Sequence, residues 1–182
     1  GEPTTYRNFD EIIAAVADLT ARRELTNVKL VLITNASMFH RAAVERGLEI
    51  LTANNGEIWA KLEAGTEEYF KQVDRTKIPF QRILDNITAA ALRRPLVIQS
   101  LFLKINGQPP GAEEIDAFCD RLSEITSSGG QIKLVQVYTL ARPPAERYVT
   151  ALSNADVDAI ADKIRTRVGL EAESFYGVGS LA

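Results

Sequence analysis

An almost unbroken run of aliphatic residues at positions 28–33 is the feature that most constrains the fold of this chain. It leads directly into the polar residues Thr34, Asn35 and Ser37. A strand that is apolar at nearly every position has both faces covered, as in a parallel sheet with helices packed on it. Polar residues just after such a strand lie where parallel α/β folds bind their ligands. The run therefore predicts a parallel sheet with a ligand-binding edge.

The same construction recurs along the chain, and segments of helical periodicity separate the apolar runs. This alternation predicts a parallel sheet with right-handed crossovers. A flat doubly wound sheet and an incomplete barrel both fit it, whereas a complete eight-stranded barrel typically needs about 250 residues. We expect further strands at 58–63, 96–104, 132–140 and 170–176, and helices at 9–23, 38–51, 66–73, 79–91, 112–126 and 153–168.

Two helix starts carry the pattern of a capping box, in which a polar first residue and an acidic residue three positions later satisfy each other's backbone N–H groups. Asn8 with Glu11 is the first pair, and Ser153 with Asp156 is the second. We therefore expect both residues to cap their helices.

Two sets of apolar residues are expected to lie inside. Ile12, Ile13, Val16 and Leu19 follow helical spacing in the first helix, as the covered face of an amphipathic helix does. Trp59 lies in the middle of an apolar strand, so we expect its ring to be buried against the helix layer.

The overall charge gives no electrostatic reason to expect a nucleic-acid partner. The formal net charge is −3, and the basic residues are scattered. A phosphate-binding protein would instead show a basic stripe or patch. No apolar run approaches the length needed to span a membrane, and the first residues do not form a signal peptide, so we expect a cytoplasmic protein without a membrane partner.

Several common kinds of site have no support in the sequence. Cys119 is the single cysteine and His40 the single histidine, so neither a thiolate cluster nor a multi-histidine metal site can form. Cys119 falls on the same helical face as Ile115 and Leu122, which favours a buried structural thiol. There is no glycine-rich nucleotide-binding motif, which leaves no sequence support for a dinucleotide or nucleoside triphosphate site.

Lys61 is the one residue that suggests covalent chemistry, because a desolvated lysine on a barrel strand can form a Schiff base. The alternative is an ion pair with Glu63, which lies on the same face of the strand, and we favour that pair. Arg142, in an irregular loop, is either a bidentate carboxylate clamp or a solvated residue.

Four segments together resemble a known family. They are Gly-Glu-Pro-Thr at 1–4, Leu-Ile-Thr-Asn-Ala-Ser at 32–37, Trp-Ala-Lys-Leu-Glu-Ala-Gly at 59–65 and Val-Gln-Val-Tyr-Thr-Leu-Ala-Arg-Pro-Pro at 135–144. In this order they resemble radical S-adenosylmethionine (radical SAM) proteins, most closely the Fe–S oxidoreductase branch related to wybutosine synthases. The resemblance covers essentially the whole chain, and Ala36 departs from the glycine common in the family.

The resemblance implies a fold and a cofactor site. The fold is a partial (β/α)6 TIM-like barrel of parallel strands with outer helices, here expected to lack one or more N-terminal strands. The backbone of Gly1, Glu2 and Pro3 would receive the methionine amino group of S-adenosylmethionine. The remaining expected contacts are Thr34, Asn35, Ser37 and Glu63 for the methionine and ribose parts, and Gln99, Ser100 and Tyr138 for the adenosine and substrate.

The resemblance also implies a part that this chain does not contain. The family's Cys-x-x-x-Cys-x-x-Cys segment, which ligates a 4Fe–4S cluster, precedes Gly-Glu-Pro-Thr, and the distant Cys119 cannot replace it. We therefore expect residues 1–182 to be a single truncated core domain, inactive alone, of an enzyme that cleaves S-adenosylmethionine reductively with an electron donor. The substrate is not readable. The alternatives are a non-catalytic module that binds a ligand or partner, and a Schiff-base lyase that uses Lys61.

Overall fold

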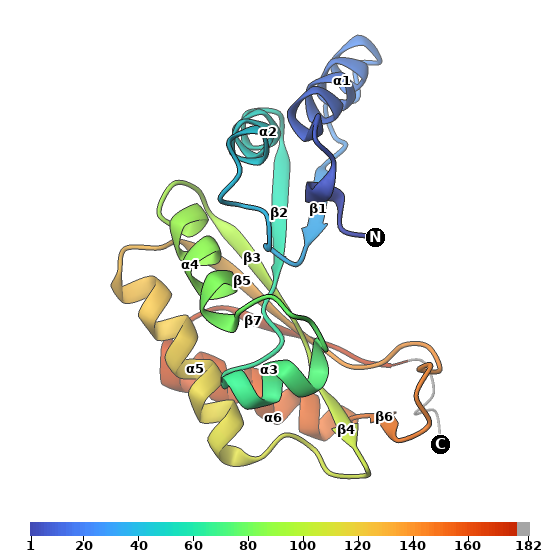
Figure 1. Cartoon of the computed structure of the whole chain (residues 1–182), viewed down its shortest axis with the longest axis vertical. Helices are drawn as coiled ribbons and strands as arrows, with labels where there is room; N and C mark the ends of the chain where they lie inside the picture. Colours follow the sequence, from blue (N-terminus) through green and yellow to red (C-terminus); the bar gives the residue numbers. More distant parts are fainter. Residues whose placement is uncertain (178–182) are drawn as a thin grey trace.

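The apolar runs form one parallel sheet within residues 1–177, the part of the chain that this computed structural model describes. Consecutive parallel strands occupy consecutive places in the sheet, so each crossover runs in the same direction (Figure 1). The strand order is β1 (Leu30–Thr34), β2 (Gly56–Lys61), β3 (Leu96–Leu101), β5 (Ile132–Tyr138) and β7 (Ala172–Phe175).

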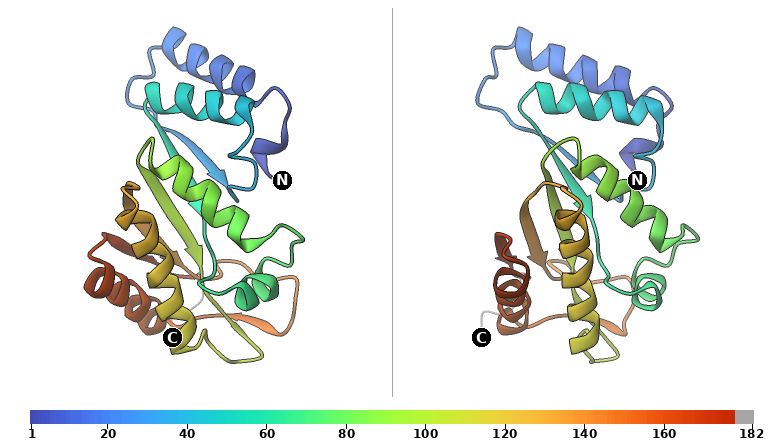
Figure 2. Two further views of the ribbon diagram at one scale, coloured as in Figure 1. Left: turned by 60° about the vertical axis from the view of Figure 1, so that its left-hand side comes forward. Right: turned by 90° about the vertical axis from the view of Figure 1, so that its left-hand side faces the viewer.

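Right-handed crossovers in one direction place the connecting helices on one face of the sheet, as in a barrel. A doubly wound sheet would carry helices on both faces. The partial TIM-like barrel is therefore confirmed as the fold, and Figure 2 shows the helices following the sheet from its β1 edge to β7. The helices are η1 (Pro3–Thr5, a 3-10 turn), α1 (Phe9–Arg22), α2 (Ala42–Ala53), α3 (Glu67–Val73), α4 (Phe80–Ala91), α5 (Ala112–Ser127) and α6 (Asn154–Val168).

The strand expected at 96–104 is divided in two. Phe102, which is fully buried, interrupts the run, and its N–H donates to the Tyr138 carbonyl oxygen at 2.8 Å. After this residue the chain leaves the main sheet as β4 (Leu103–Ile105), which pairs antiparallel with β6 (Val149–Ala151). The small second sheet arises because two distant segments pair, which local periodicity does not encode.

One of the two expected capping boxes is confirmed and the other is wrong. The Ser153 hydroxyl accepts the Asp156 N–H at 3.1 Å, and the Asp156 carboxylate accepts the Ser153 N–H at 3.2 Å. Asn8 also precedes its helix, but its side chain makes no capping hydrogen bond. Its ψ of 38° departs from the extended conformation that an N-cap residue adopts, which explains the difference.

The expected inward face of the first helix is confirmed only for Ile13, which is partly buried against the core. Ile12, Val16 and Leu19 are 39%, 38% and 54% exposed, whereas Phe9 and Ala17 are buried. Helix α1 packs on α2, and the Phe9 ring lies over Gly47. The helical period of α1 was predicted correctly. Which of its faces is buried depends on the elements that pack against it, and none of residues 1–177 covers the face with Ile12, Val16 and Leu19.

The expected burial of Trp59 is also wrong. Its ring is half-buried and lies on the sheet face opposite that of its buried neighbours Ile58 and Ala60. Trp59 Nε1 donates to Glu57 Oε2 at 3.0 Å. Burial opposes the charge on Glu57, but hydrogen bonds from Lys133, Lys29 and Trp59 outweigh it and lower the pKa of Glu57 to about 2. The face of the sheet without helices therefore carries an ionic cluster around Glu57. The largely apolar sequences of the strands did not predict it.

Among residues 1–177, no helix is both long and apolar enough to cross a bilayer.

Candidate cofactor site at the carboxyl ends of the strands

The N-terminal residues are fastened to the end of β1 through the Glu2 carboxylate. Glu2 Oε1 accepts hydrogen bonds from Thr34 Oγ1 at 2.7 Å and from the Thr4 N–H at 3.0 Å, and Glu2 Oε2 accepts the Asn35 N–H at 2.8 Å. Thr34 and Thr4 are buried, so this carboxylate is shielded on one side. The side chain of Glu2 is thus used structurally, and it holds the backbone of Gly1 and Pro3 beside the strand end.

The loop after β1 is held by a second set of hydrogen bonds. Asn35 Oδ1 accepts the Ser37 N–H at 3.0 Å, and Asn86 Nδ2 of α4 donates to the Ala36 and Ser37 carbonyl oxygens at 2.8 and 3.2 Å. Ala36 has a φ of +59°, a region that glycine enters at lower cost. Ser37 is buried within this turn. The loop is therefore pre-organised, and Asn35 lies at the border of the neighbouring cavity.

At the end of β2, Lys61 and Glu63 form the ion pair that the sequence favoured. Lys61 Nζ lies 2.9 Å from Glu63 Oε1, and the Tyr138 hydroxyl on β5 donates to the same oxygen at 3.3 Å. Burial disfavours the Lys61 ammonium, but the charge and hydrogen bond of Glu63, together with Tyr138, outweigh it and raise the pKa of Lys61. A lysine held in its charged form is a poor nucleophile, which argues against the Schiff-base alternative.

Burial and the Glu63 charge also raise the pKa of Tyr138 to about 12. The phenol is therefore neutral at physiological pH and available as a hydrogen-bond donor. Tyr138 and Glu63 come from strands separated by β3, so their contact spans the carboxyl ends of three strands.

Contacts with α5 fix the segment that follows Glu63. Glu114, which is buried, accepts the Gly65 N–H and the Thr66 hydroxyl, each at 2.5 Å. Gly65 passes so close to the Phe118 backbone that a Cβ at this position would collide with it. This contact holds the segment between β2 and α3 in place and with it the Glu63 side chain.

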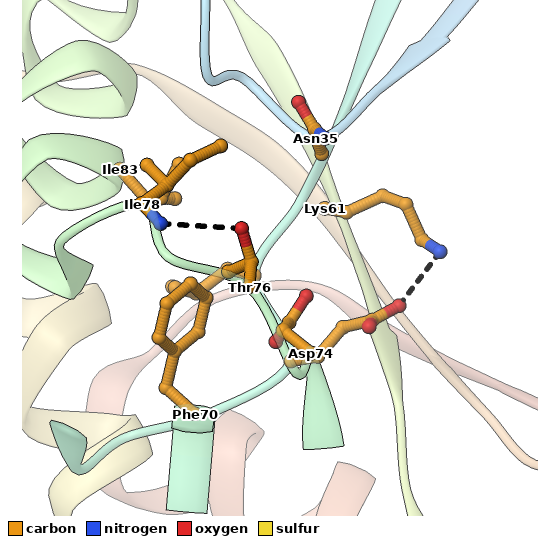
Figure 3. Close-up of a pocket in the computed structure, with 9 residues that line it drawn as sticks. Asn35, Lys61, Phe70, Asp74, Thr76, Ile78 and Ile83 are labelled. Carbon is orange, nitrogen blue, oxygen red and sulfur yellow. Dashed lines mark hydrogen bonds and ion pairs between the residues drawn. The ribbon is translucent and has the colours of Figure 1, made fainter. Parts of the chain in front are cut away.

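A cavity of about 80 Å³ opens beside the Lys61–Glu63 pair (Figure 3). Asp74, at the end of α3, lines it, and its Oδ2 atom is buried with no hydrogen-bond partner in the described chain. Burial and then the Glu63 charge raise the pKa of Asp74 to about 7, although Lys61 opposes this. The other lining residues are Asn35, Leu62, Phe70, Thr76, Ile78 and Ile83.

The later strands bring only part of the expected set to this edge. Gln99 on β3 is half-buried, and its Nε2 donates to Gln136 Oε1 on β5 at 3.1 Å. Ser100 points to the opposite face, is fully buried and has an unpartnered Oγ atom. Arg142 is exposed in the loop after β5. The structure therefore joins Glu2, Thr34 and Asn35 in one set of contacts and Glu63 and Tyr138 in another, and Asn35 and Glu63 line the same cavity. Ser100 lies instead in the helix-side core.

Asp74 is the residue that sequence reasoning missed. An aspartate just after a short amphipathic helix ordinarily lies in solvent, and nothing local distinguishes this one. Its significance comes from its place at the C-terminal end of α3, where it lines the same cavity as Glu63 and interacts with that charge.

No metal centre forms among residues 1–177, since no group of three or more His, Cys, Asp or Glu side chains lies together there. Cys119 is buried in α5, as its helical position predicted, and burial raises the pKa of its thiol. The residues present therefore do not fit a 4Fe–4S cluster.

Comparisons with known proteins find the fold but no sequence family. No family model matches the chain, and no curated protein matches it. A solved domain of pyruvate-formate lyase-activating enzyme from Bacteroides vulgatus superposes with a TM-score of 0.63 at 15% identity, over 96% of this chain and 94% of that one.

A radical SAM methyltransferase from Sphaerobacter thermophilus superposes with a TM-score of 0.54 at 14% identity, over 82% of this chain and 40% of that one. The chain thus matches less than half the length of this second structure. At these identities the likeness concerns the fold, and we conclude that this chain has the partial-barrel fold of a pyruvate-formate lyase-activating enzyme domain and of a radical SAM methyltransferase.

Proposed function

We propose that this chain is the S-adenosylmethionine-binding part of a radical SAM enzyme core. The observation that carries the proposal is the joining of two motif segments about thirty residues apart: the Glu2 carboxylate binds both Thr34 Oγ1 and the Asn35 N–H at the end of β1. Each segment resembles its counterpart in the family, and their contact makes one ligand-facing unit. The shared partial-barrel fold supports the same assignment.

The residues of this chain would bind and orient the cofactor. The backbone at Gly1, Glu2 and Pro3 would supply polar groups for the methionine end. The buried Asp74 oxygen that lacks a partner lines the same cavity as Asn35 and Glu63, which supports a polar ligand group there. Gln99 and Tyr138 face the same edge further along the sheet. In the parent enzyme the bound cofactor supplies a 5′-deoxyadenosyl radical for hydrogen abstraction.

The finer assignments come from the sequence motifs. On these we place the chain with the Fe–S oxidoreductase branch related to wybutosine synthases, as a core domain in a cytoplasmic enzyme that an external donor supplies with electrons. The net charge of −3 gives no support for nucleic acid, so tRNA is not proposed as the substrate. A module that binds a ligand or partner without catalysis is the alternative, because the residues present do not hold a cluster.

We expect anaerobic reconstitution of this chain with iron and sulfide to give no stoichiometric 4Fe–4S cluster. One buried thiol replaces the three thiolates that the family uses. Absorption and electron paramagnetic resonance spectra, with the iron content per chain, measure the result. A cluster signal in a one-to-one ratio with protein that disappears in Cys119→Ala would contradict this expectation.

We expect S-adenosylmethionine to bind with a dissociation constant of about 0.1–1 mM, or roughly 4–5.5 kcal/mol of binding free energy. Only part of the family's site is present, and ordering the N-terminal residues adds a cost on binding. Glu63→Ala should weaken binding by about tenfold, because it removes a buried hydrogen-bond acceptor and leaves Lys61 without its partner.

Isothermal titration calorimetry of the wild-type chain, Glu63→Ala and the control Glu67→Ala tests the proposal. Glu67 is exposed on α3 and pairs with Lys71, so its loss should leave the affinity unchanged. Micromolar affinity that survives Glu63→Ala would refute the site, and no binding at millimolar concentration would refute the proposed cofactor.

A further inference from the structure

The cavity beside the Lys61–Glu63 pair has an uncompensated acidic group. Two carboxyl groups, those of Glu63 and Asp74, face one ammonium group, that of Lys61. The Glu63 Oε1 atom is already engaged by Lys61 and Tyr138, while Asp74 Oδ2 is buried without a partner. A buried polar atom that lacks a partner destabilises the folded protein, so a ligand that supplies the missing interaction gains binding free energy from it.

The remaining walls suit a cation that carries alkyl groups. Phe70, Ile78 and Ile83 are apolar, and Figure 3 shows the Phe70 ring and the Asp74 carboxyl lying on the same side of the cavity. An aromatic ring attracts a cation through its negative face, and apolar walls favour an alkylated one over a hydrated metal ion. A volume of about 80 Å³ exceeds the roughly 10–15 Å³ that one water needs, so a small methylated group can enter.

We infer that this cavity binds the positive centre of an organic monocation, a sulfonium or alkylated ammonium group, with the Asp74 carboxylate as the residue that selects it. The inference rests on the proposed function for the identity of its ligand, because S-adenosylmethionine carries a sulfonium. Asp74 would distinguish that cofactor from S-adenosylhomocysteine, whose thioether is neutral.

The charges around Asp74 set the direction of a pH dependence. The charged groups that shift the pKa of Asp74 are Lys61, the last residue of β2, and Glu63, which follows this strand. The nearby Tyr138 on β5 is neutral at physiological pH. Tyr69, on the helix α3 that precedes Asp74, is also neutral, because its pKa is raised to about 12. Arg75, which follows Asp74, is exposed and paired with Glu146. Without a ligand, Asp74 therefore keeps its proton up to a pH of about 7.

A bound cation stabilises the ionised carboxylate, so binding releases this proton, and affinity rises as the pH increases through the value at which free Asp74 titrates. With a pKa of about 7 in the free protein, the ionised fraction rises about tenfold between pH 6 and pH 8. Below that range the proton competes with the ligand, and above it the affinity is constant.

The test compares S-adenosylmethionine with S-adenosylhomocysteine by calorimetry at pH 6 and pH 8. Both ligands carry the amino acid and adenosine groups, so the ratio of their dissociation constants chiefly reports the sulfonium charge. In the wild-type chain the preference for S-adenosylmethionine should increase about tenfold from pH 6 to pH 8. In Asp74→Asn, which keeps the shape but not the charge, the preference should be smaller and independent of pH.

Asp85→Asn is the matched control, because Asp85 is exposed on α4, where it accepts a hydrogen bond from Gln81 Nε2 at 2.8 Å, and it does not line the cavity. It should retain the wild-type pH dependence. A preference that is the same in the wild-type chain and in Asp74→Asn overturns the inference and leaves the proposed cofactor intact.

A second measurement is independent of that cofactor. The Asp74 carboxyl is titrated by carbon-13 NMR with and without trimethylsulfonium, and we expect the cation to lower its pKa by about one unit, or tenfold in the proton affinity. If this shift occurs but S-adenosylmethionine does not bind, the cation site stands and the proposed function fails. If the shift is absent, the cation site is refuted whatever the cofactor does.

Discussion

Replacing Phe118 by alanine is expected to lower the free energy of unfolding by about 3–5 kcal/mol, the range for removing a buried aromatic ring. The ring is fully buried and meets Phe102 edge-to-face, with 5.3 Å between centroids and an interplanar angle of 85°. Phe102 is itself the residue at which the chain leaves the main sheet. The cavity created would thus lie where α5 packs on the junction of both sheets, and little can collapse into it.

Urea unfolding measures this loss, and Trp59→Ala is the contrasting variant. Trp59 is half-buried on the open face and donates one hydrogen bond to Glu57, so its loss should cost only about 1–2 kcal/mol. Equal losses for the two variants would show that the open face is covered in solution. A loss below about 1 kcal/mol for Phe118→Ala would refute the packing of α5 described here.

Asp74→Asn is expected to stabilise the protein at pH 8, by about 2–4 kcal/mol. Burial and the Glu63 charge raise the pKa of Asp74 from 3.8 to about 7 in the folded state. Each unit of difference corresponds to about 1.4 kcal/mol, and screening by solvent at this partly open cavity lowers the total. A neutral asparagine occupies the same space without the ionisation cost.

The sign follows from the protons that each state binds. Between about pH 4 and pH 7 the unfolded chain has released the Asp74 proton while the folded chain retains it, so stability falls as pH rises through this window. Below the unfolded value both states are protonated, and the two variants should be equally stable. The favourable contribution of protonated Asp74 to the free energy of unfolding is thus fully present at acid pH and is lost by about pH 7.

Urea unfolding of the wild-type chain and of Asp74→Asn at intervals from pH 4 to pH 8 measures the difference directly. Groups such as Glu57, whose lowered pKa acts in the opposite direction at acid pH, are common to both proteins and cancel. Asp85→Asn should show no such divergence. If Asp74→Asn is less stable than the wild-type chain at pH 8, the carboxylate has a favourable partner that would remove the basis for the cation site.

The two capping boxes show which helix starts can be predicted from local sequence alone. Ser153 and Asp156 satisfy each other within one helical turn, so their contact follows from spacing alone. Asn8 and Glu11 have the same spacing, but the backbone that enters α1 is directed by η1, whose position depends on the Glu2 contacts with β1. A distant contact therefore overrides the local preference.

The strands show the same division. The run at β1 was located, but β1 is an edge strand and its Val31 and Ile33 are 41% and 46% exposed, so the expectation that both of its faces are covered is wrong. The runs at β2, β3 and β5 could be located because both faces of an interior parallel strand are apolar, and the polar ends of all four strands could be expected to meet at one edge. The same property hides which face of β2 meets the helices, and Trp59 therefore lay on the side opposite the expected one. Exposure of Ile12, Val16 and Leu19 likewise depends on which elements cover α1, which helical spacing does not contain.

The sequence by itself determined the order of elements, the parallel sheet, the burial of Cys119, the Lys61–Glu63 pair and the edge on which the polar residues gather, because each depends on spacing along one element or on the shared direction of parallel strands. Only the tertiary structure decided the partial barrel over the doubly wound sheet, the burial of Ser100 away from that edge and the approach of Asp74 to Glu63. These depend on contacts between segments far apart in the chain. The ionisation of a carboxyl group in particular is set by its neighbours in space, which have no fixed spacing in sequence.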